Sequence, residues 1–289
     1  MYQDTFPAPR PDTISSVLIT GASGGLGKAF AVEAASRGWS LFLTDLQAEP
    51  LEVLATGLCH AYAVPVRVAA CDLTDPASRA ALFQHLRGAG LRFWALINVA
   101  GTDFEGPFFE QTSRQIRTII RLNVEGTLDM THAALELRDP LRPFRIINIA
   151  SLAAFYPMPV KATYAASKRF LLDFSLALRE EVRPAGVTVT VLCPAGLPTT
   201  PSCVQAIESQ GLMGQLTTQD IGSVANLTLN CALSGQAIVI PGAANRILQV
   251  LGSLAPASLV ARLIGWRWSS ARQKVSLQER DAVALTNPA

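Results

Sequence analysis

Charged residues are scarce in this sequence. Only 16% of its 289 residues are charged, whereas 49% are hydrophobic, so the composition is not that of a disordered or solvating chain. The formal net charge of +2 is spread along the chain without a basic cluster, and we therefore expect no nucleic-acid partner. The composition predicts a globular protein with a large apolar core.

Residues that build metal sites and disulfide frameworks are also few. The five cysteines include no Cys-x-x-Cys pair and the three histidines have no ligand spacing, so we predict no metal site. The N-terminus lacks a charged region followed by an apolar one, so we see no secretory signal and expect a cytoplasmic protein. The sequence also lacks the ~20 uninterrupted apolar residues that a bilayer-spanning helix needs.

Short apolar segments recur along most of the chain. Seven of them are unbroken by polar alternation, which is typical of strands buried on both faces of a parallel sheet. These segments are 17–20, 40–44, 66–70, 95–98, 145–150, 187–192 and 237–240. Helical patterns fall between them, for example over 26–37, 77–87, 113–138, 164–183 and 218–233. The alternation predicts an α/β fold, a doubly wound Rossmann-type sheet of seven parallel strands with helices on both faces.

A glycine-rich turn, Thr20 to Gly27, joins the first predicted strand to the first helix. The spacing of Gly21, Gly25 and Gly27 lets backbone amides approach a pyrophosphate at the helix N-terminus. Asp45 ends the second strand, where the adenosine ribose of a dinucleotide is expected. Its carboxylate accepts hydrogen bonds from ribose hydroxyls and repels a 2′-phosphate. We therefore predict NAD as the cofactor, with NADP less favoured.

A second motif runs from Tyr164 to Lys168, with Ser151 thirteen residues before the tyrosine. A phenol has a reference pKa of about 10, so it needs a nearby cation to act as an acid or base at neutral pH. Lys168 lies one helical turn after Tyr164, and a serine hydroxyl in reach can hold the reacting oxygen. The same Tyr-x-x-x-Lys spacing is common on ordinary amphipathic helices, so the surrounding motifs decide between the two interpretations.

Together these motifs resemble the short-chain dehydrogenase/reductase family over roughly residues 16–242. The family's Thr-Gly-x-x-x-Gly-x-Gly occurs as Thr20 to Gly27, and its adenine-contacting aspartate is similar to Asp72. Its Asn-Asn-Ala-Gly occurs as residues 98–101, where Val99 replaces the second asparagine.

The loop after the sixth strand is similar to the family's Pro-Gly-x-x-x-Thr segment. It runs from Pro194 to Thr199, with Ala195 in place of the glycine. The resemblance implies that this loop holds the nicotinamide, with Thr199 on the carboxamide. The alanine departs from the pattern and leaves the local backbone less defined.

The resemblance also implies the site residues. In the catalytic set, Tyr164 is the general acid/base, Lys168 lowers the pKa of Tyr164 and binds the nicotinamide ribose, Ser151 positions the reacting oxygen, and Asn123 completes a water-linked proton path. The implied cofactor-binding residues are Gly21, Ser23, Gly24, Gly25, Leu26, Gly27, Asp45, Asp72, Leu73, Asn98, Ala100, Gly101, Tyr164, Lys168, Pro194 and Thr199.

The implied activity is an NAD(P)-dependent oxidoreductase that interconverts a secondary alcohol and its ketone. Segments 152–160 and 198–216 are largely apolar and are expected to flank the site, so we predict an apolar substrate such as a hydroxysteroid or a hydroxyacyl chain. The residues that we expect to line its pocket are Phe155, Tyr156, Met158 and Leu212. One alternative is a 3-oxoacyl-thioester reductase, and a non-enzymatic one is a dinucleotide-sensing regulator.

The expected organisation is a tail over residues 1–14, a single Rossmann-fold catalytic domain over 15–242, and a C-terminal extension over 243–289. We expect the extension to pack over the substrate cleft or a subunit interface. The alternative is an amphipathic element on a membrane surface. The resemblance implies a homodimer or homotetramer formed through helices 113–138 and 164–183.

Overall fold

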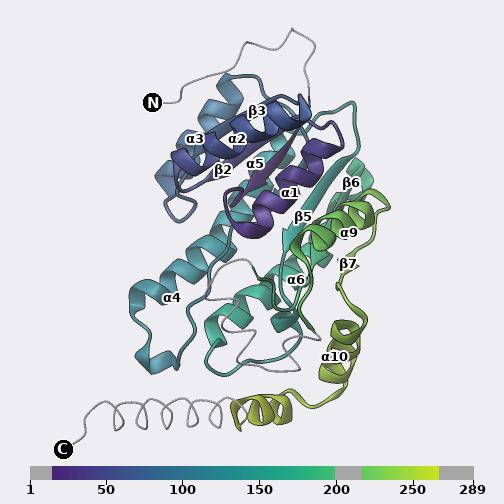
Figure 1. The fold of residues 1–289 in the computed structure, drawn as a ribbon. Helices are drawn as coiled ribbons and strands as arrows, with labels where there is room; N and C mark the ends of the chain where they lie inside the picture. Colours follow the sequence, from purple (N-terminus) through teal and green to yellow (C-terminus); the bar gives the residue numbers. More distant parts are fainter. Residues whose placement is uncertain (1–14, 199–216, 267–289) are drawn as a thin grey trace, which may run out of the picture.

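The computed structural model describes residues 15–198 and 217–266, which build one seven-stranded parallel sheet (Figure 1). The strand order is β3-β2-β1-β4-β5-β6-β7, so the winding direction reverses between β1 and β4. The strands are β1 Ser16–Thr20, β2 Leu41–Asp45, β3 Val66–Ala70, β4 Phe93–Asn98, β5 Phe144–Ile149, β6 Val187–Leu192 and β7 Ile238–Val239. The predicted doubly wound fold is confirmed.

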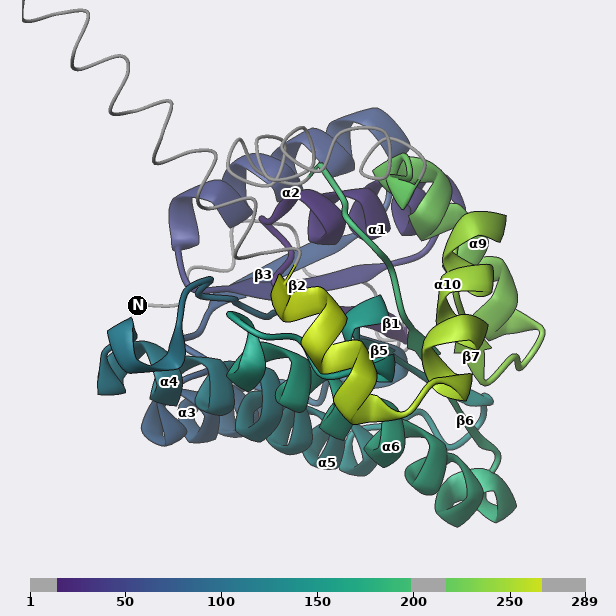
Figure 2. The ribbon, with the colours of Figure 1, turned by 90° about the horizontal axis from the view of Figure 1, so that it is seen from below.

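Helices cover both faces of this sheet (Figure 2). One face carries α1 Gly25–Ser36, α2 Ala48–Tyr62 and α9 Ile221–Leu233, and the other carries α3 Pro76–Gly88, α4 Ser113–Ile120, α5 Thr127–Glu136 and α6 Ala162–Val182. Shorter 3-10 helices are η1 Phe108–Glu110, η3 Leu152–Phe155 and η4 Arg183–Ala185. Beyond β7 the chain forms α10, Ala243–Leu254, and a further helix over 257–266.

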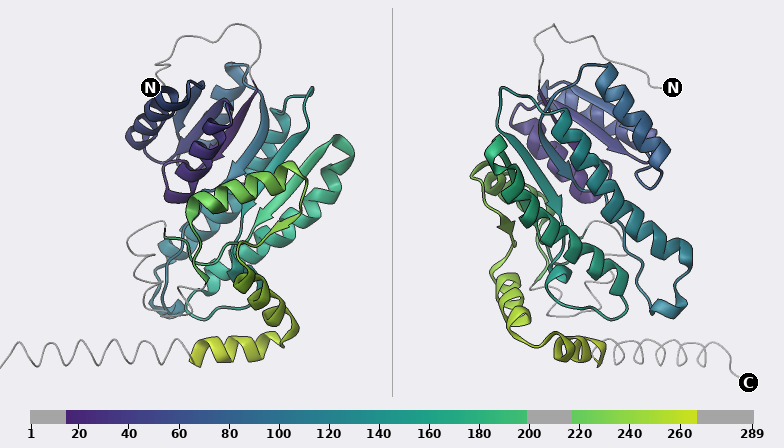
Figure 3. Two further views of the ribbon diagram at one scale, coloured as in Figure 1. Left: turned by 45° about the vertical axis from the view of Figure 1, so that its right-hand side comes forward. Right: turned by 180° about the vertical axis from the view of Figure 1, so that it is seen from behind.

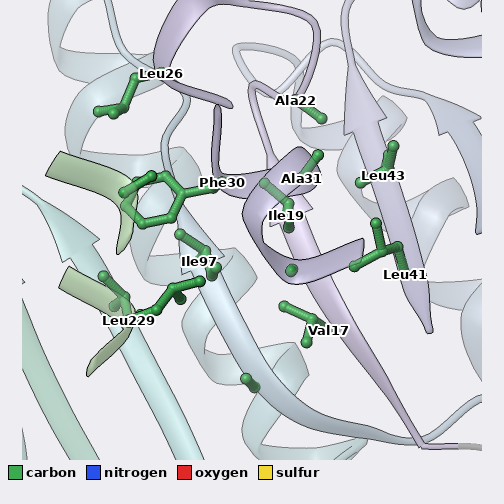
Figure 4. Packing of buried hydrophobic residues seen from close by; sticks show 14 of the residues in the cluster. Val17, Ile19, Ala22, Leu26, Phe30, Ala31, Leu41, Leu43, Ile97 and Leu229 are labelled. Carbon is green, nitrogen blue, oxygen red and sulfur yellow. The ribbon is translucent and has the colours of Figure 1, made fainter. Parts of the chain in front are cut away.

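The core explains why the strands are mostly apolar. In β1, Val17 and Ile19 belong to the cluster under α1, whereas Leu18 belongs to the cluster on the opposite face. Phe30 of α1 is fully buried over Ile97 in the first cluster (Figure 4). Burying a side chain of this size contributes about 1.5–3 kcal/mol. Both faces of the sheet are therefore covered, which favours apolar side chains at most strand positions.

The long helix expected over 113–138 is interrupted. A π-helical turn, η2 Arg121–Gly126, separates α4 from α5. Gly126 lets the helix pass close to the loop after β3, because a Cβ atom at this position would lie 3.1 Å from the carbonyl oxygen of Leu73. The wide turn contains Asn123, whose side chain is fully buried. Single π turns inside helices often mark functional positions, and this one is directed at the carboxyl edge of the sheet.

Candidate active site

The glycine turn occupies the point where the strand order reverses, between β1 and α1. Gly21 has φ +63°, and a Cβ atom there would lie 2.7 Å from the backbone of Ala100. A Cβ atom on Gly27 would lie 2.0 Å from the carbonyl oxygen of Gly21. Both positions therefore require glycine, and the resulting turn is tight.

The turn leaves the start of α1 open to an anion. Gly24 is the N-cap, no side chain caps the helix, and its first turn contains no acidic residue. Uncapped N–H groups and the positive end of the helix dipole are what a pyrophosphate needs. Gly24, Gly25 and Leu26 thus lie at the open start of α1, and the turn fits the predicted dinucleotide.

Asp45 lies at the end of β2, directly beside the glycine turn. Its Oδ2 accepts hydrogen bonds from the backbone N of Ser23 at 2.9 Å and from its Oγ at 2.6 Å. Its Oδ1 accepts from the backbone N of Leu46 at 2.7 Å. The carboxylate is therefore fixed in place, with free lone pairs that fit ribose hydroxyls and oppose a phosphate.

The loop after β3 is also ordered by an aspartate. Asp72 Oδ1 accepts hydrogen bonds from the N and Oγ1 of Thr74 at 2.8 and 2.7 Å. The carbonyl oxygen of Leu73, itself buried, accepts from Arg79 Nη1 at 2.7 Å and faces Gly126. These bonds hold the loop against the π turn, on the side of the sheet where adenosine is expected.

The loop after β4 approaches the glycine turn from the other side of the switch point. Thr20 Oγ1 accepts hydrogen bonds from the backbone N of Val99 at 3.1 Å and of Ala100 at 3.3 Å. A Cβ atom on Gly101 would lie 3.3 Å from both Asn123 Oδ1 and Lys168 Nζ. Gly101 therefore gives the backbone a close path past two of the predicted catalytic side chains.

Asn98 is the predicted cofactor residue that the structure turns away from this site. Its Nδ2 donates to Thr131 Oγ1 at 3.0 Å and to Asn148 Oδ1 at 2.9 Å, inside the core. Asn148 in turn donates to Ser175 Oγ at 2.9 Å. The side chain of Asn98 thus joins β4 to β5 and α5, and it does not lie with the glycine turn.

Asn123 connects the π turn to the loop after β4 and to α6. Its Oδ1 accepts from the backbone N of Thr102 at 2.9 Å, and its Nδ2 donates to the carbonyl oxygen of Thr102 at 3.0 Å. Nδ2 also donates to Ser167 Oγ at 3.0 Å, and this hydroxyl donates to the carbonyl oxygen of Tyr164 at 2.7 Å. Asn123 therefore positions the helical turn that carries Tyr164 and Lys168.

Lys168 is almost fully buried, with 4% of its surface exposed. Its Nζ donates to the carbonyl oxygen of Ile149 at 2.8 Å, two residues before Ser151. Burial lowers the pKa of Lys168 to about 8, opposed in part by Cys193 and Asp103. The opposition from Cys193 is small near neutral pH, because burial raises the pKa of that thiol to about 12 and keeps it uncharged.

Tyr164 lies between two lysines. The Nζ atoms of Lys168 and Lys161 lie 5.6 Å and 5.9 Å from the centroid of its ring. Lys161 is bonded to two carboxylates, Asp103 at 2.6 Å and Glu105 at 3.0 Å. Burial works against its charge, but these carboxylates outweigh burial and raise the pKa of Lys161. Lys168 donates to a neutral carbonyl instead, so its charge remains available to stabilise a phenolate.

The sequence analysis missed this acidic pair and Lys161. Lys161 precedes Tyr164 by one helical turn, which is the signal that would have found it. No sequence spacing links Lys161 to Asp103 and Glu105, because the two segments meet only in the folded chain. The cluster fixes the entry into α6 from the loop after β4.

Ser151 follows β5 and begins η3. Its Oγ accepts a hydrogen bond from the backbone N of Ala153 at 3.1 Å, so the hydroxyl hydrogen remains available to a substrate. Leu152 N donates to the carbonyl oxygen of Pro194 at 2.8 Å, which joins this segment to the loop after β6. Pro194 is thereby placed at the same edge, whereas Thr199 and Leu212 lie outside the described residues.

A basic cluster lies on α4 and the first residue of η2, at one side of the site. Arg114, Arg117 and Arg121, with Thr74 and Thr118, line a groove of about 410 Å³. Within residues 15–198 and 217–266, none of the three arginines forms an ion pair. The prediction of no basic cluster was therefore wrong. The three arginines are three and four residues apart and therefore share one helix face, so positive charge is concentrated there although the net charge of the chain is small.

Comparison with known proteins gives the same assignment as the geometry. A family model described as short chain dehydrogenase matches residues 15–209. A solved short-chain dehydrogenase from Sphingobium yanoikuyae in complex with NADPH is 30% identical, with a TM-score of 0.69. That alignment covers 88% of this chain and 94% of the solved one.

Two curated relatives differ in the substrates that their names give. Sulfoacetaldehyde reductase from Chromohalobacter salexigens is 38% identical over 180 residues, which are 62% of this chain and 70% of the relative. Very-long-chain 3-oxoacyl-CoA reductase from Pyrenophora tritici-repentis is 31% identical over 176 residues, 60% of this chain. The match spans only 52% of that fungal protein. Motifs, geometry and the family match agree, and the chain belongs to the short-chain dehydrogenase/reductase family, as an oxidoreductase acting on CH–OH groups.

Proposed function

We propose that the protein interconverts an apolar secondary alcohol and its ketone, with NAD as the preferred cofactor. The observation that carries this proposal is Tyr164 beside the buried Lys168, whose ammonium is held by β5 two residues before Ser151. Burying the charge of a lysine destabilises the folded protein, so a buried lysine beside a phenol indicates a functional role for the pair.

The chain's own residues handle the proton in this reaction. A bound nicotinamide cofactor supplies or accepts the hydride. During reduction, the hydroxyl of Tyr164 donates its proton to the carbonyl oxygen of the substrate, and Ser151 donates a hydrogen bond to the same oxygen. Lys168 stabilises the phenolate that results, and oxidation runs through the same groups in reverse. Asn123 keeps the turn of α6 that carries both residues in register.

An apolar substrate is favoured by the segment that follows Ser151. Leu152, Ala153 and Ala154 of η3 are buried, and the ring of Tyr156 packs under α10. Burial raises the pKa of Tyr156 to about 12, so this second tyrosine stays protonated and is not a competing acid or base at neutral pH. The segment that follows Ser151 is therefore largely apolar and buried, which supports an apolar substrate.

The preference for NAD rests on Asp45. Its carboxylate is fixed beside the glycine turn, where a 2′-phosphate would meet a like charge. The similar dehydrogenase from Sphingobium was solved with NADPH, so a preference for NADP is the alternative that an assay has to exclude.

A substrate screen tests the proposal. Purified protein is assayed with alcohols and ketones of graded size, with NAD and NADP in parallel, by absorbance of the reduced nicotinamide. We expect kcat/KM to rise with the apolar surface of the substrate and to be higher with NAD. Turnover of small polar aldehydes alone, as the name of the Chromohalobacter relative suggests, would contradict the apolar assignment.

The basic groove on α4 favours a second candidate, a 3-oxoacyl-thioester reductase. Arg114, Arg117 and Arg121 form no ion pair with any residue that the structure describes, so on one helix face they repel one another. Planar guanidinium groups bind phosphates in bidentate fashion. They suit the phosphates of a coenzyme A thioester. Arg117→Gln would then raise KM for a 3-oxoacyl-CoA but not for a short ketone. The control Arg183→Gln changes a side chain that is 75% exposed in η4, just after α6, and should change neither KM.

We also propose that the protein forms a homodimer or homotetramer through α4, α5 and α6. Phe170 of α6 is 41% exposed and stacks on Phe174 at 6.0 Å, which gives this helix an outward aromatic patch. Such a patch suits a subunit contact. Light scattering of the full chain distinguishes a dimer or tetramer from a monomer.

A further inference from the structure

Each of the two C-terminal helices presents a set of apolar side chains to solvent. On α10 these are Ile247, Val250, Leu251 and Leu254, which are 50% to 79% exposed. On the helix over 257–266 they are Leu259, Leu263 and Trp266, which are 46% to 72% exposed. In each helix the spacing is three or four residues, so each set forms one face. We call these seven residues the outer face.

The opposite side of both helices packs on the segment that follows Ser151. A Cβ atom on Gly252 would lie 2.7 Å from the ring of Tyr156, and one on Gly265 would lie 3.5 Å from Pro159. Figure 3 shows α10 leaving the sheet and the following helix turning sideways to run beneath the domain. The apolar residues of the outer face are therefore not the residues that these helices use to pack on the domain.

The charged residues that the sequence places in these two helices and just after them are of one sign. Between residues 243 and 274 the sequence has no aspartate or glutamate, and its cations are Arg246, Arg262, Arg267, Arg272 and Lys274. Arg246 and Arg262 directly precede Ile247 and Leu263, so both lie beside the outer face. Apolar side chains with a tryptophan, bordered by arginines, are the pattern of helices that lie in the interface of an anionic bilayer.

We propose that the outer face binds the surface of a bilayer containing anionic phospholipids. Its apolar side chains enter the acyl boundary and its arginines pair with lipid phosphates. The structure shows how this would serve the site, because one helix diameter, about 10 Å, separates the bilayer from the segment after Ser151. An apolar substrate dissolved in the membrane would then reach the enzyme without crossing water. Among the helices that the structure describes, none has the length and apolar character of a membrane span.

Vesicle flotation of the full chain tests this proposal without any substrate, so its outcome is independent of the proposed reaction. We expect the protein to float with phosphatidylcholine vesicles that contain phosphatidylglycerol, and to stay unbound with phosphatidylcholine alone or in high salt. The variant Leu254→Glu/Leu263→Glu, with one change on each helix, should lose at least about tenfold in partitioning, because two apolar contacts become charged.

The chain offers a matched control in Leu141→Glu/Phe109→Glu. These side chains are 91% and 86% exposed, outside the outer face, so the control adds the same two charges. It should float like the unchanged protein, and circular dichroism should show both variants folded. Equal flotation of the outer-face variant, or no flotation of the unchanged protein, would overturn the proposal. A dimer that the outer-face variant alone dissociates, without lipid binding, would instead assign the face to a second copy of the chain.

Discussion

Replacing Lys168 with methionine tests whether this lysine is retained for chemistry at the expense of stability. Lys168 is 4% exposed, and its pKa falls from 10.5 to about 8 on folding. A difference of this size corresponds to about 3 kcal/mol of destabilisation of the folded state wherever the lysine is charged in both states. Methionine has a similar length and no charge, so Lys168→Met removes this cost.

The sign of the pH dependence follows from proton binding. Because the folded-state pKa lies below the unfolded one, the unfolded chain binds more protons between about pH 8 and 10.5, and wild-type stability rises with pH in that window. Below about pH 8 the full cost is present. The variant lacks this titration. It also leaves the carbonyl oxygen of Ile149 without its donor, at a cost of about 1–2 kcal/mol that does not depend on pH.

The expected result is that the difference in the free energy of unfolding between the wild type and Lys168→Met changes with pH. From pH 7 to 9.5, the free energy of unfolding of the wild type should rise by about 2 kcal/mol relative to Lys168→Met. Urea unfolding without cofactor, at one protein concentration and both pH values, measures it. Lys28→Met, at an exposed position of α1, is the control. Its free energy of unfolding should differ from that of the wild type by the same amount at both pH values. If the difference for Lys168→Met is also constant, the lysine is not buried in its charged form and the reasoning is refuted.

Two further substitutions address the cofactor and the positioning of α6. Asp45→Ala should raise the ratio of kcat/KM with NADP to that with NAD by about tenfold or more, because the like charge is lost. Ser23→Ala removes only one hydrogen bond to Asp45 and should leave that ratio unchanged. If Asp45→Ala and Ser23→Ala shift the ratio equally, the cause is a change in the glycine turn and not the charge of Asp45. Asn123→Ala breaks three hydrogen bonds and should cost about 2–4 kcal/mol in urea unfolding together with most of the turnover. Asn148→Ala, also fully buried and bonded, should lose comparable stability but keep its kcat, so equal loss of kcat in both would contradict a positioning role for Asn123.

The sheet was predictable because its order depends on patterns that are local in the sequence. Runs such as Phe93–Asn98 are almost entirely apolar and are buried on both faces, and the glycine turn after β1 has a spacing that needs no tertiary information. The helix Ala48–Tyr62 was not among the segments singled out, since its apolar positions are interrupted by Pro50, Thr56 and Gly57. Propensity weakens there, and packing of α2 on the sheet decides the structure instead.

The remaining differences come from contacts between distant segments. The π turn around Asn123 depends on bonds to Thr102, twenty-one residues earlier, so helical periodicity alone predicts an unbroken helix. Asn98 was assigned to the cofactor through its motif, but its amide finds partners inside the core on β5 and α5. The pairing of Lys161 with Asp103 spans fifty-eight residues and has no sequence signature.

The most direct test of the account is Tyr164→Phe, which removes one oxygen atom and leaves the ring between its two lysines. We expect the NAD dissociation constant, measured by calorimetry, to stay within about twofold, because the glycine turn and Asp45 are untouched. Turnover of the best substrate should fall by at least about a hundredfold, the usual contribution of a positioned general acid. Full turnover in this variant, with NAD bound normally, would contradict the assignment of Tyr164 as the residue that transfers the proton.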